Sequence, residues 1–189
     1  MRPLFTVHAG EYLVGEFIEK KFSSLNVWIP SKDTGIDLLV TNSTNTKSVS
    51  LQVKLSRDYR SYHADDPFES TLTVGGWFKL NHSKIEESTA DYWVFILVAH
   101  DKKIKPRHIV ISPKELLKRL IQVHTKLTTY NFYLWIRDDD RLALDGRGLS
   151  KKDKSLLMGG NYALGSRDYS SYIEKWDPLK KLCSPEKIL

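Results

Sequence analysis

The sequence predicts an α/β domain in which a mixed β-sheet is flanked by α-helices. An amphipathic helix comes first, with apolar residues at helical spacing over residues 9–22. Short apolar or alternating runs, typical of strands, follow at residues 26–29, 36–41 and 48–55. The run 92–99 is almost wholly apolar, as expected for a central strand covered on both faces. A helix, then strands, then alternating elements favours helices packed on a sheet.

The second half of the chain continues this alternation. Ser112 is a favourable N-cap and Pro113 suits the first helical position, which predicts a helix directly after the strand 108–111. The polar tract 42–46 is a turn, so the strands on either side of it should be antiparallel neighbours. The other expected elements are a short strand at 72–74, a turn at 75–76, a helix beginning within 80–87, a hairpin of 131–137 and 141–144, and short helices near 150–158 and 168–176.

Length and composition favour one domain. The chain has 189 residues, of which 41% are hydrophobic, enough for one sizeable core. We expect a single domain over 1–189, with its core at about 8–137 and a helical extension at about 145–189. No run reaches the roughly 18 apolar residues of a membrane helix, and the first residues lack the apolar region of a signal peptide. One cysteine cannot form an internal disulfide, which suits the cytoplasm.

The charge of the chain is uneven. Residues 1–100 carry 10 Lys and Arg against 12 Asp and Glu, whereas residues 101–189 carry 19 against 11. Within 102–126, which includes Lys114 and Lys118, Glu115 is the only acid among eight basic residues. Such a surplus favours a polyanionic partner, because neutralised phosphates release counterions. An ordinary solvated face of a basic protein is the alternative.

A carboxylate and an alternating strand form the most informative pattern. Residues 49–55 alternate apolar and polar side chains, so Gln52 and Lys54 must project from the same face of a strand. Asp37 opens the preceding apolar strand. An acid at a strand end, beside a lysine on the neighbouring strand, can hold a divalent cation and orient an attacking water. This pattern predicts a nuclease.

Glu11 is a third candidate site residue. On a helical wheel it aligns with Val14, Ile18 and Phe22, at the edge of the apolar arc. Burial of an unpaired charge is costly, so this position is reasonable if a cation or a lysine meets the carboxylate. The alternative is a first-turn acid that interacts favourably with the helix dipole.

These residues resemble the PD-(D/E)XK superfamily of restriction-endonuclease-like nucleases. That pattern has an acid in the first helix, an acid that opens an apolar strand, and (Asp/Glu/Gln)-x-Lys on the next strand. The resemblance covers about residues 8–56 and rests on three segments, Gly10-Glu11-Tyr12-Leu13-Val14, Gly35-Ile36-Asp37-Leu38-Leu39-Val40 and Leu51-Gln52-Val53-Lys54. It implies a restriction-endonuclease-like fold, with a mixed β-sheet core flanked by α-helices.

The resemblance also implies a site and its chemistry. Mg²⁺, for which Mn²⁺ can substitute, would be held by Asp37, by the side-chain oxygen of Gln52, by the carbonyl of Val53 and by Glu11, directly or through water. Lys54 would orient or deprotonate the attacking water. The expected products are a 5′-phosphate and a 3′-hydroxyl. Most of the superfamily has Glu or Asp where this chain has Gln52, and the amide keeps the oxygen ligand but loses a negative charge.

The expected function is therefore that of a metal-dependent DNA endonuclease that hydrolyses phosphodiester bonds, and a restriction or defence system is a setting that suits it. A nucleic-acid-binding module with a degraded site and a structure-selective nuclease, such as a junction resolvase, are the alternatives. A homodimer is expected if both strands are cut. Arg57 and Arg60 alternate with tyrosines in the loop after the active-site strand and are expected to contact DNA, as are Lys114 and Lys118. A mixed surface loop is the alternative for residues 56–69.

Other site classes are not supported. The six histidines are scattered without the spacing of zinc ligands. The acidic run 138–140 lacks the spacing of a calcium-binding EF-hand loop, and a hairpin turn explains it better. No phosphate-binding GxxxxGK[ST] loop is present, which argues against an ATPase.

Overall fold

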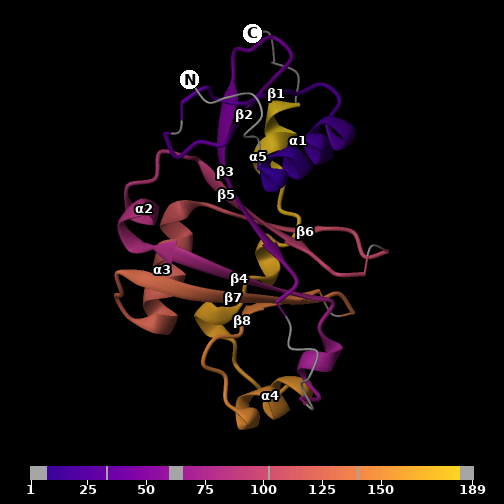
Figure 1. Ribbon diagram of the computed structural model, residues 1–189, viewed down its shortest axis with the longest axis vertical. Helices are drawn as coiled ribbons and strands as arrows, with labels where there is room; N and C mark the ends of the chain where they lie inside the picture. The colour runs from indigo at the N-terminus through magenta and orange to yellow at the C-terminus, as the bar shows by residue number, and fades with distance from the viewer. Residues whose placement is uncertain (1–7, 33, 60–65, 102, 140, 184–189) are drawn as a thin grey trace.

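Two β-sheets that pack against each other form the centre of this mixed α/β protein (Figure 1). The computed structural model describes residues 8–32, 34–59, 66–101, 103–139 and 141–183. Within these residues the chain forms a mixed sheet flanked by helices, as the sequence predicts. The second sheet was not expected, because the sequence analysis places all the strands in one sheet.

The larger sheet contains, in spatial order, β1 (Asn26–Trp28), β2 (Leu38–Thr41), β3 (Ser48–Arg57), β5 (Tyr92–Val98) and β6 (Arg107–Ile111). Neighbouring strands in it are antiparallel except β3 and β5, which are parallel. The smaller sheet is antiparallel and contains β4 (Val74–Asn81), β7 (Thr129–Arg137) and β8 (Leu142–Asp145). The hairpins β2–β3 and β7–β8 confirm the turns predicted around residues 42–46 and 138–140.

Helices cover the outer face of the larger sheet and close the core between the sheets. The helices are α1 (Ala9–Lys21), α2 (His82–Glu86), α3 (Pro113–His124), α4 (Lys151–Met158) and α5 (Asp177–Leu182). α1 and α5 pack on one face of the larger sheet, where Val14, Ile18 and Trp176 are fully buried. The other face packs on the smaller sheet, with Ile85 of α2 and Leu116 of α3 in the same core. None of the helices in the described ranges is long and apolar enough to cross a bilayer.

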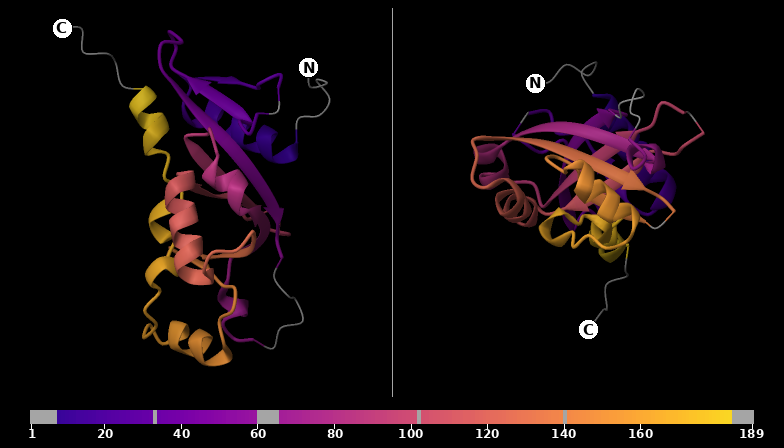
Figure 2. Two further views of the ribbon diagram at one scale, coloured as in Figure 1. Left: turned by 90° about the vertical axis from the view of Figure 1, so that its left-hand side faces the viewer. Right: turned by 90° about the horizontal axis from the view of Figure 1, so that it is seen from below.

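β3 is the strand that positions the candidate site. It is ten residues long and runs from beside α1 toward the end of the molecule that carries α4, as the purple strand in Figure 2 shows. Its first half pairs with β2, whose last rung joins Leu38 to Leu51. Its second half pairs with β5 through Arg57. Beyond Leu51, therefore, the edge of β3 that faces β2 has no strand beside it among the described residues.

The N-terminal turn of α1 lies directly against this part of β3. A Cβ atom added to Gly10 would lie 2.9 Å from Cβ of Leu55 and 3.3 Å from Cγ1 of Val53. Real Cβ atoms do not approach that closely, so Gly10 sets how near α1 comes to the strand. This close packing brings the following residue, Glu11, next to β3.

We expect Gly10→Ala to destabilise the protein by about 1–3 kcal/mol, because the added methyl group would force α1 away from β3. Gly15→Ala in the same helix is the matched control, since its Cβ would meet Cγ1 of Val27 at an ordinary 3.7 Å. Helix propensity alone should make that control up to about 1 kcal/mol more stable. Urea unfolding of both variants measures the difference, and an equal effect of the two substitutions would contradict the close approach.

Glu174 anchors the C-terminal segment to the larger sheet. Its Oε1 accepts hydrogen bonds from the backbone N–H of His108 at 3.0 Å and from Nδ1 of His108 at 2.9 Å, while Oε2 accepts from Nε1 of Trp176 at 2.9 Å. Burial raises the pKa of the Glu174 carboxyl, but these hydrogen bonds and the charge of His108 outweigh burial and hold the pKa below its usual value. The carboxylate thus joins β6 to the residues that precede α5.

Two predicted elements are corrected. Of the expected strand at 72–74 only Val74 is in a strand, and it begins β4, which runs through the expected turn Gly75-Gly76 to Asn81. Gly76 suits this strand because a Cβ there would lie 2.9 Å from Phe78 and 3.0 Å from Leu97. The helix predicted within 80–87 therefore begins only at His82.

The helix predicted near 168–176 is also wrong. A short 3-10 turn at Gly165–Arg167 precedes that segment, another at Ser170–Tyr172 lies within it, and the helix that follows is α5. The backbone here bonds to distant strands, since Tyr169 N–H donates to the carbonyl of Ala143 and Glu174 N–H donates to that of His108. The helical spacing of its aromatic residues thus reflects separate core contacts.

Candidate functional site

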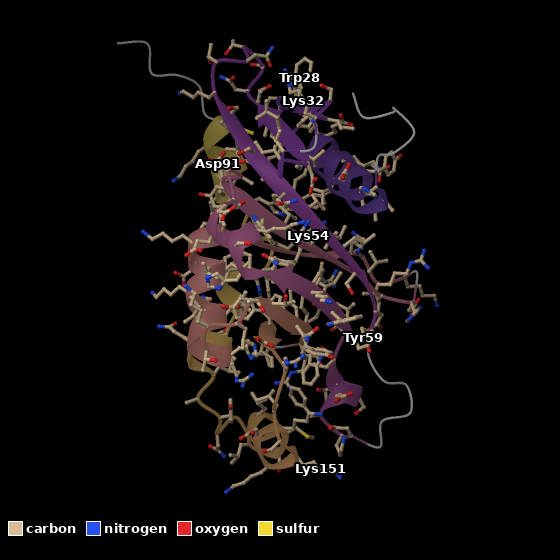
Figure 3. The ribbon with its side chains drawn as sticks, turned by 60° about the vertical axis from the view of Figure 1, so that its left-hand side comes forward. Trp28, Lys32, Lys54, Tyr59, Asp91 and Lys151 are labelled. Atoms are coloured by element: carbon tan, nitrogen blue, oxygen red, sulfur yellow. The ribbon has the colours of Figure 1, made fainter. Side chains whose placement is uncertain are left out.

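The five residues predicted to form the centre of the site line one open cavity. Its volume is about 1190 Å³, and its lining includes Glu11, Asp37, Gln52, Val53 and Lys54. These residues come from α1, from the residue before β2, and from the middle of β3. Figure 3 shows Lys54 near the middle of β3, between Trp28 and Tyr59. The structure therefore brings together the acids, the amide and the lysine that the sequence pattern singled out.

Asp37 extends the β2–β3 ladder with its side chain. Its backbone N–H donates to the carbonyl of Leu51 at 2.8 Å, and its Oδ2 accepts from the backbone N–H of Val53 at 2.7 Å. The carboxylate thus takes the place of the next strand residue at the open edge of β3. Only 5% of the residue is exposed. No described residue donates a hydrogen bond to Oδ1, which leaves that oxygen for a ligand.

The carbonyl of Val53 faces the same edge. In a strand, the N–H and C=O of one residue point to the same side. Because the Val53 N–H points to Asp37, its carbonyl oxygen must also point toward the edge that β2 has left open. The backbone therefore supports the predicted place of this carbonyl among the oxygen donors.

The Gln52 amide has two orientations that differ by a half-turn. In one, Nε2 donates to Oδ2 of Asp37 at 3.3 Å. In the other, Nε2 donates to the carbonyl of Gly35 at 3.0 Å and Oε1 accepts from Nζ of Lys54 at 3.1 Å. The second orientation satisfies both ends of the amide, and amide orientation is properly assigned from such networks.

The second orientation also bears on metal binding. It puts Oε1 of Gln52 where the nitrogen was, 3.3 Å from Oδ2 of Asp37. Two oxygen acceptors this close repel each other unless a cation lies between or beside them. Carboxylate, amide and carbonyl oxygens are the donors that Mg²⁺ prefers. The residues present therefore fit a hard divalent cation.

Lys54 is held over an aromatic ring. Its Nζ lies 5.5 Å from the centroid of the Trp93 ring, a distance within the range of a cation–π interaction. Trp93 pairs with Gln52 across β3 and β5. The amide oxygen and the ring together direct the ammonium group into the cavity.

Glu11 reaches the cavity from the first turn of α1. The residue is only 4% exposed, which agrees with a wheel position at the edge of the apolar arc. A second buried carboxylate in the lining of the same cavity as Asp37 increases the negative charge available to a cation. In the described part of the chain, however, no three His, Cys, Asp or Glu side chains gather as a metal-binding group. A cation here would depend on the Gln52 and Val53 oxygens as well as on two carboxylates.

The rest of the cavity lining was not predicted from the sequence. It includes Lys79 and Asn81 of β4, Lys84 of α2 and Thr129 of β7. The signal in the sequence was the alternation of apolar and polar residues from Phe78 to Asn81, which the preceding glycine pair obscured. Lys79 and Lys84 bring positive charge to the cavity that the predicted acids also line, which suits a bound phosphate.

The predicted DNA contacts lie elsewhere. Arg57 is exposed at the end of β3, but alternation puts it on the face of Val53 rather than that of Lys54. Lys114 and Lys118 are exposed on α3. None of these three side chains lines the cavity, and Arg60 is outside the described residues. Among the described residues, the lysines that line the cavity are Lys54, Lys79 and Lys84.

Comparisons with protein-family models, with curated proteins and with solved structures found no match to this chain. The functional assignment therefore depends on the arrangement of the site residues.

Proposed function

We propose that this protein is a metal-dependent endonuclease that hydrolyses phosphodiester bonds of DNA, with a restriction-endonuclease-like fold. The observation that carries the proposal is the convergence of Glu11, Asp37, Gln52 and Lys54 on one cavity. Burial of two carboxylates is costly without compensating charge, and here both line the same cavity as a lysine, at the open edge of a strand. A charge-compensated site for a cation and a phosphate accounts for all four.

Each residue has a distinct role in this proposal. Asp37, Glu11, the Gln52 side-chain oxygen and the Val53 carbonyl would hold Mg²⁺. The cation would supply charge to the scissile phosphate and lower the pKa of water. Lys54 orients the attacking water and places a positive charge beside the phosphate as negative charge develops. Lys79 and Lys84 hold the flanking phosphates of the strand.

Incubation with supercoiled plasmid in Mg²⁺, in Mn²⁺ and in excess EDTA tests this function directly. We expect nicked or linear DNA with either metal and intact plasmid with EDTA. Direct appearance of linear DNA would support a homodimer, because cutting both strands together requires two sites. Mapping the ends should give 5′-phosphates and 3′-hydroxyls. Cleavage that persists in EDTA would contradict the proposed role of the metal.

A binding module is the second candidate, and Gln52 is the residue that favours it. An amide brings no charge to the cation, so this donor set is weaker than one with three carboxylates. A protein of this kind would shift DNA in a gel without cutting it in Mg²⁺ or Mn²⁺.

We expect Gln52→Glu to bind divalent cations more tightly, because it adds a negative charge 3.3 Å from Asp37. At an effective dielectric constant near 20, one charge acting on the cation at this range is worth at least about 1.4 kcal/mol, or tenfold in metal affinity. Calorimetric titration with Mn²⁺ measures the affinity. Gln52→Leu, which removes the side-chain oxygen, should weaken the binding of Mn²⁺. If the two substitutions shift it in the same direction, Gln52 is not a metal ligand.

A further inference from the structure

Three exposed or half-buried aromatic residues gather beside the candidate site. We call Tyr59, Trp77 and Tyr133 the aromatic platform. The Tyr59 ring centroid lies 5.3 Å from that of Trp77 and 6.0 Å from that of Tyr133. Tyr59 is 55% exposed and Trp77 is 41% exposed. Large aromatic surfaces left open to water in this way mark binding sites more often than isolated exposed residues do.

The platform is part of an ordered sheet surface. Trp77 and Tyr133 are directly paired across β4 and β7, on the face opposite the buried Phe78 and Phe132. Nε1 of Trp77 donates to Oδ1 of Asn131 at 3.3 Å. These contacts hold the rings in place before any ligand arrives, which reduces the entropy cost of binding.

The charge around the platform suits a polyanion. The guanidinium of Arg147 lies 5.7 Å from the centroid of the Tyr133 ring, and Lys79 is exposed two residues beyond Trp77 on the same face. Residues 77–81 and 129–133, which form this part of the sheet surface, contain no acid. Aromatic rings interleaved with cations are the usual surface for stacking bases and holding phosphates.

The platform is continuous with the cavity. Lys79 belongs to the face that carries Trp77 and also lines the cavity. The end of β3 joins the same surface, since the N–H of Trp77 donates to Oγ of Ser56 at 3.0 Å and the N–H of Tyr59 donates to the carbonyl of Gly75 at 2.8 Å. Figure 3 shows Tyr59 just beyond the end of the strand that carries Lys54. A strand of nucleic acid bound at Lys54 could therefore extend over the rings.

We propose that the aromatic platform binds unpaired nucleotides of the DNA strand whose phosphate enters the cavity. The proposal rests on the proposed function for its polyanionic substrate and adds the substrate class, namely DNA with a single-stranded portion. A base within a duplex already has neighbours on both faces, so a protein ring can stack only on an unpaired or terminal base. The platform therefore selects for single-stranded segments next to the bond in the cavity.

The test is fluorescence-anisotropy binding of a labelled oligothymidylate and of a duplex of the same length, in EDTA so that no strand is cut. We expect the wild-type protein to prefer the single strand and Trp77→Ala to lose roughly tenfold to a hundredfold in single-strand affinity. Trp77→Phe should stay within about threefold of wild type, because a phenyl ring still stacks. Trp28→Ala is the matched control, since Trp28 is 50% exposed on β1 and distant from the platform (Figure 3), and it should bind as wild type does.

The outcomes separate this proposal from the nuclease assignment. Loss of single-strand binding in Trp77→Ala, without plasmid cleavage by the wild type, would support the platform and overturn the nuclease. Cleavage by the wild type, with equal binding by Trp77→Ala and Trp28→Ala, would overturn the platform and leave the nuclease. Exposed aromatic rings can also form a protein–protein interface, and light scattering tests this by measuring the oligomeric state. If Trp77→Ala converts a dimer into a monomer and leaves single-strand affinity unchanged, the rings form such an interface and the proposal is wrong.

Discussion

Replacement of Lys54 by methionine is expected to slow DNA cleavage by about 10² to 10⁴ fold, the contribution typical of a side chain that assists proton transfer. Methionine is one heavy atom shorter than lysine but keeps an unbranched apolar stem, and its sulfur can still pack on the Trp93 ring. The ammonium group that contacts Oε1 of Gln52 at 3.1 Å is lost. The substitution therefore removes charge from the cavity with little effect on packing.

Single-turnover cleavage at saturating Mg²⁺ measures this effect without interference from product release. Lys151→Met removes an exposed lysine on α4 and serves as the control for the loss of one positive charge (Figure 3). We expect the control to cleave at nearly the wild-type rate. A Lys54→Met protein that cleaves as fast as this control would show that Lys54 takes no part in the reaction.

Asp37→Asn is expected to reduce cleavage by at least about a hundredfold, because the loss of a ligand charge removes several kcal/mol of charge stabilisation near the phosphate. The fold should survive, since the asparagine oxygen can still accept the Val53 N–H hydrogen bond that Asp37 accepts at 2.7 Å. Asp37→Ala would leave that N–H without its acceptor and should cost about 1–3 kcal/mol of stability. Comparison of the two variants thus separates the electrostatic role of Asp37 from its structural one.

Thermal unfolding and calorimetric titration with Mn²⁺ measure the two roles. Asp91→Asn is a close control, because Oδ2 of Asp91 accepts from the backbone N–H of Ser50 at 2.8 Å and from its hydroxyl at 2.7 Å. Asp91 thus caps β3 as Asp37 does, but it does not line the cavity. The control should keep its metal affinity and its cleavage rate. Asp37→Asn with unchanged metal affinity would remove Asp37 from the proposed ligands.

DNA binding by the inactive variants separates the nuclease from the binding module. Lys79 and Lys84 face the cavity from β4 and α2, and neither Lys54→Met nor Asp37→Asn removes them. We therefore expect both variants to retain most of the affinity for DNA. If the wild-type protein binds DNA but does not cut it, the result would instead support the binding module with a degraded site.

Much of the local structure follows from side-chain periodicity. The first helix, β3 and the buried strand β5 appear within a residue or two of their predicted bounds. Both signals that predict α3 act as expected. Ser112 is the N-cap, with its Oγ accepting a hydrogen bond from the N–H of Glu115, and Pro113 is the first residue of the helix. These elements have strong patterns because one face of each is buried along its whole length.

The errors occur where distant contacts override a local signal. Gly75-Gly76 has the composition of a turn but lies in a strand, because Leu97 of β5 packs where a side chain would be. The aromatic residues near 169–176 have helical spacing, yet the backbone there bonds to Ala143 and His108. No local pattern contains either partner, so sequence reasoning could not anticipate these contacts.

The sequence by itself determined that Gln52 and Lys54 share one face of a strand, because side chains alternate in any β-strand whatever surrounds it. It also determined an acid at the start of the preceding strand and an acid at the edge of the apolar face of the first helix. Only the tertiary structure decided that the Asp37 carboxylate caps β3 at Val53, and that the second sheet supplies Lys79, Trp77 and Tyr133. The physical reason is that alternation acts within one element, whereas the distance between elements depends on how closely their side chains pack, as Gly10 against Leu55 shows.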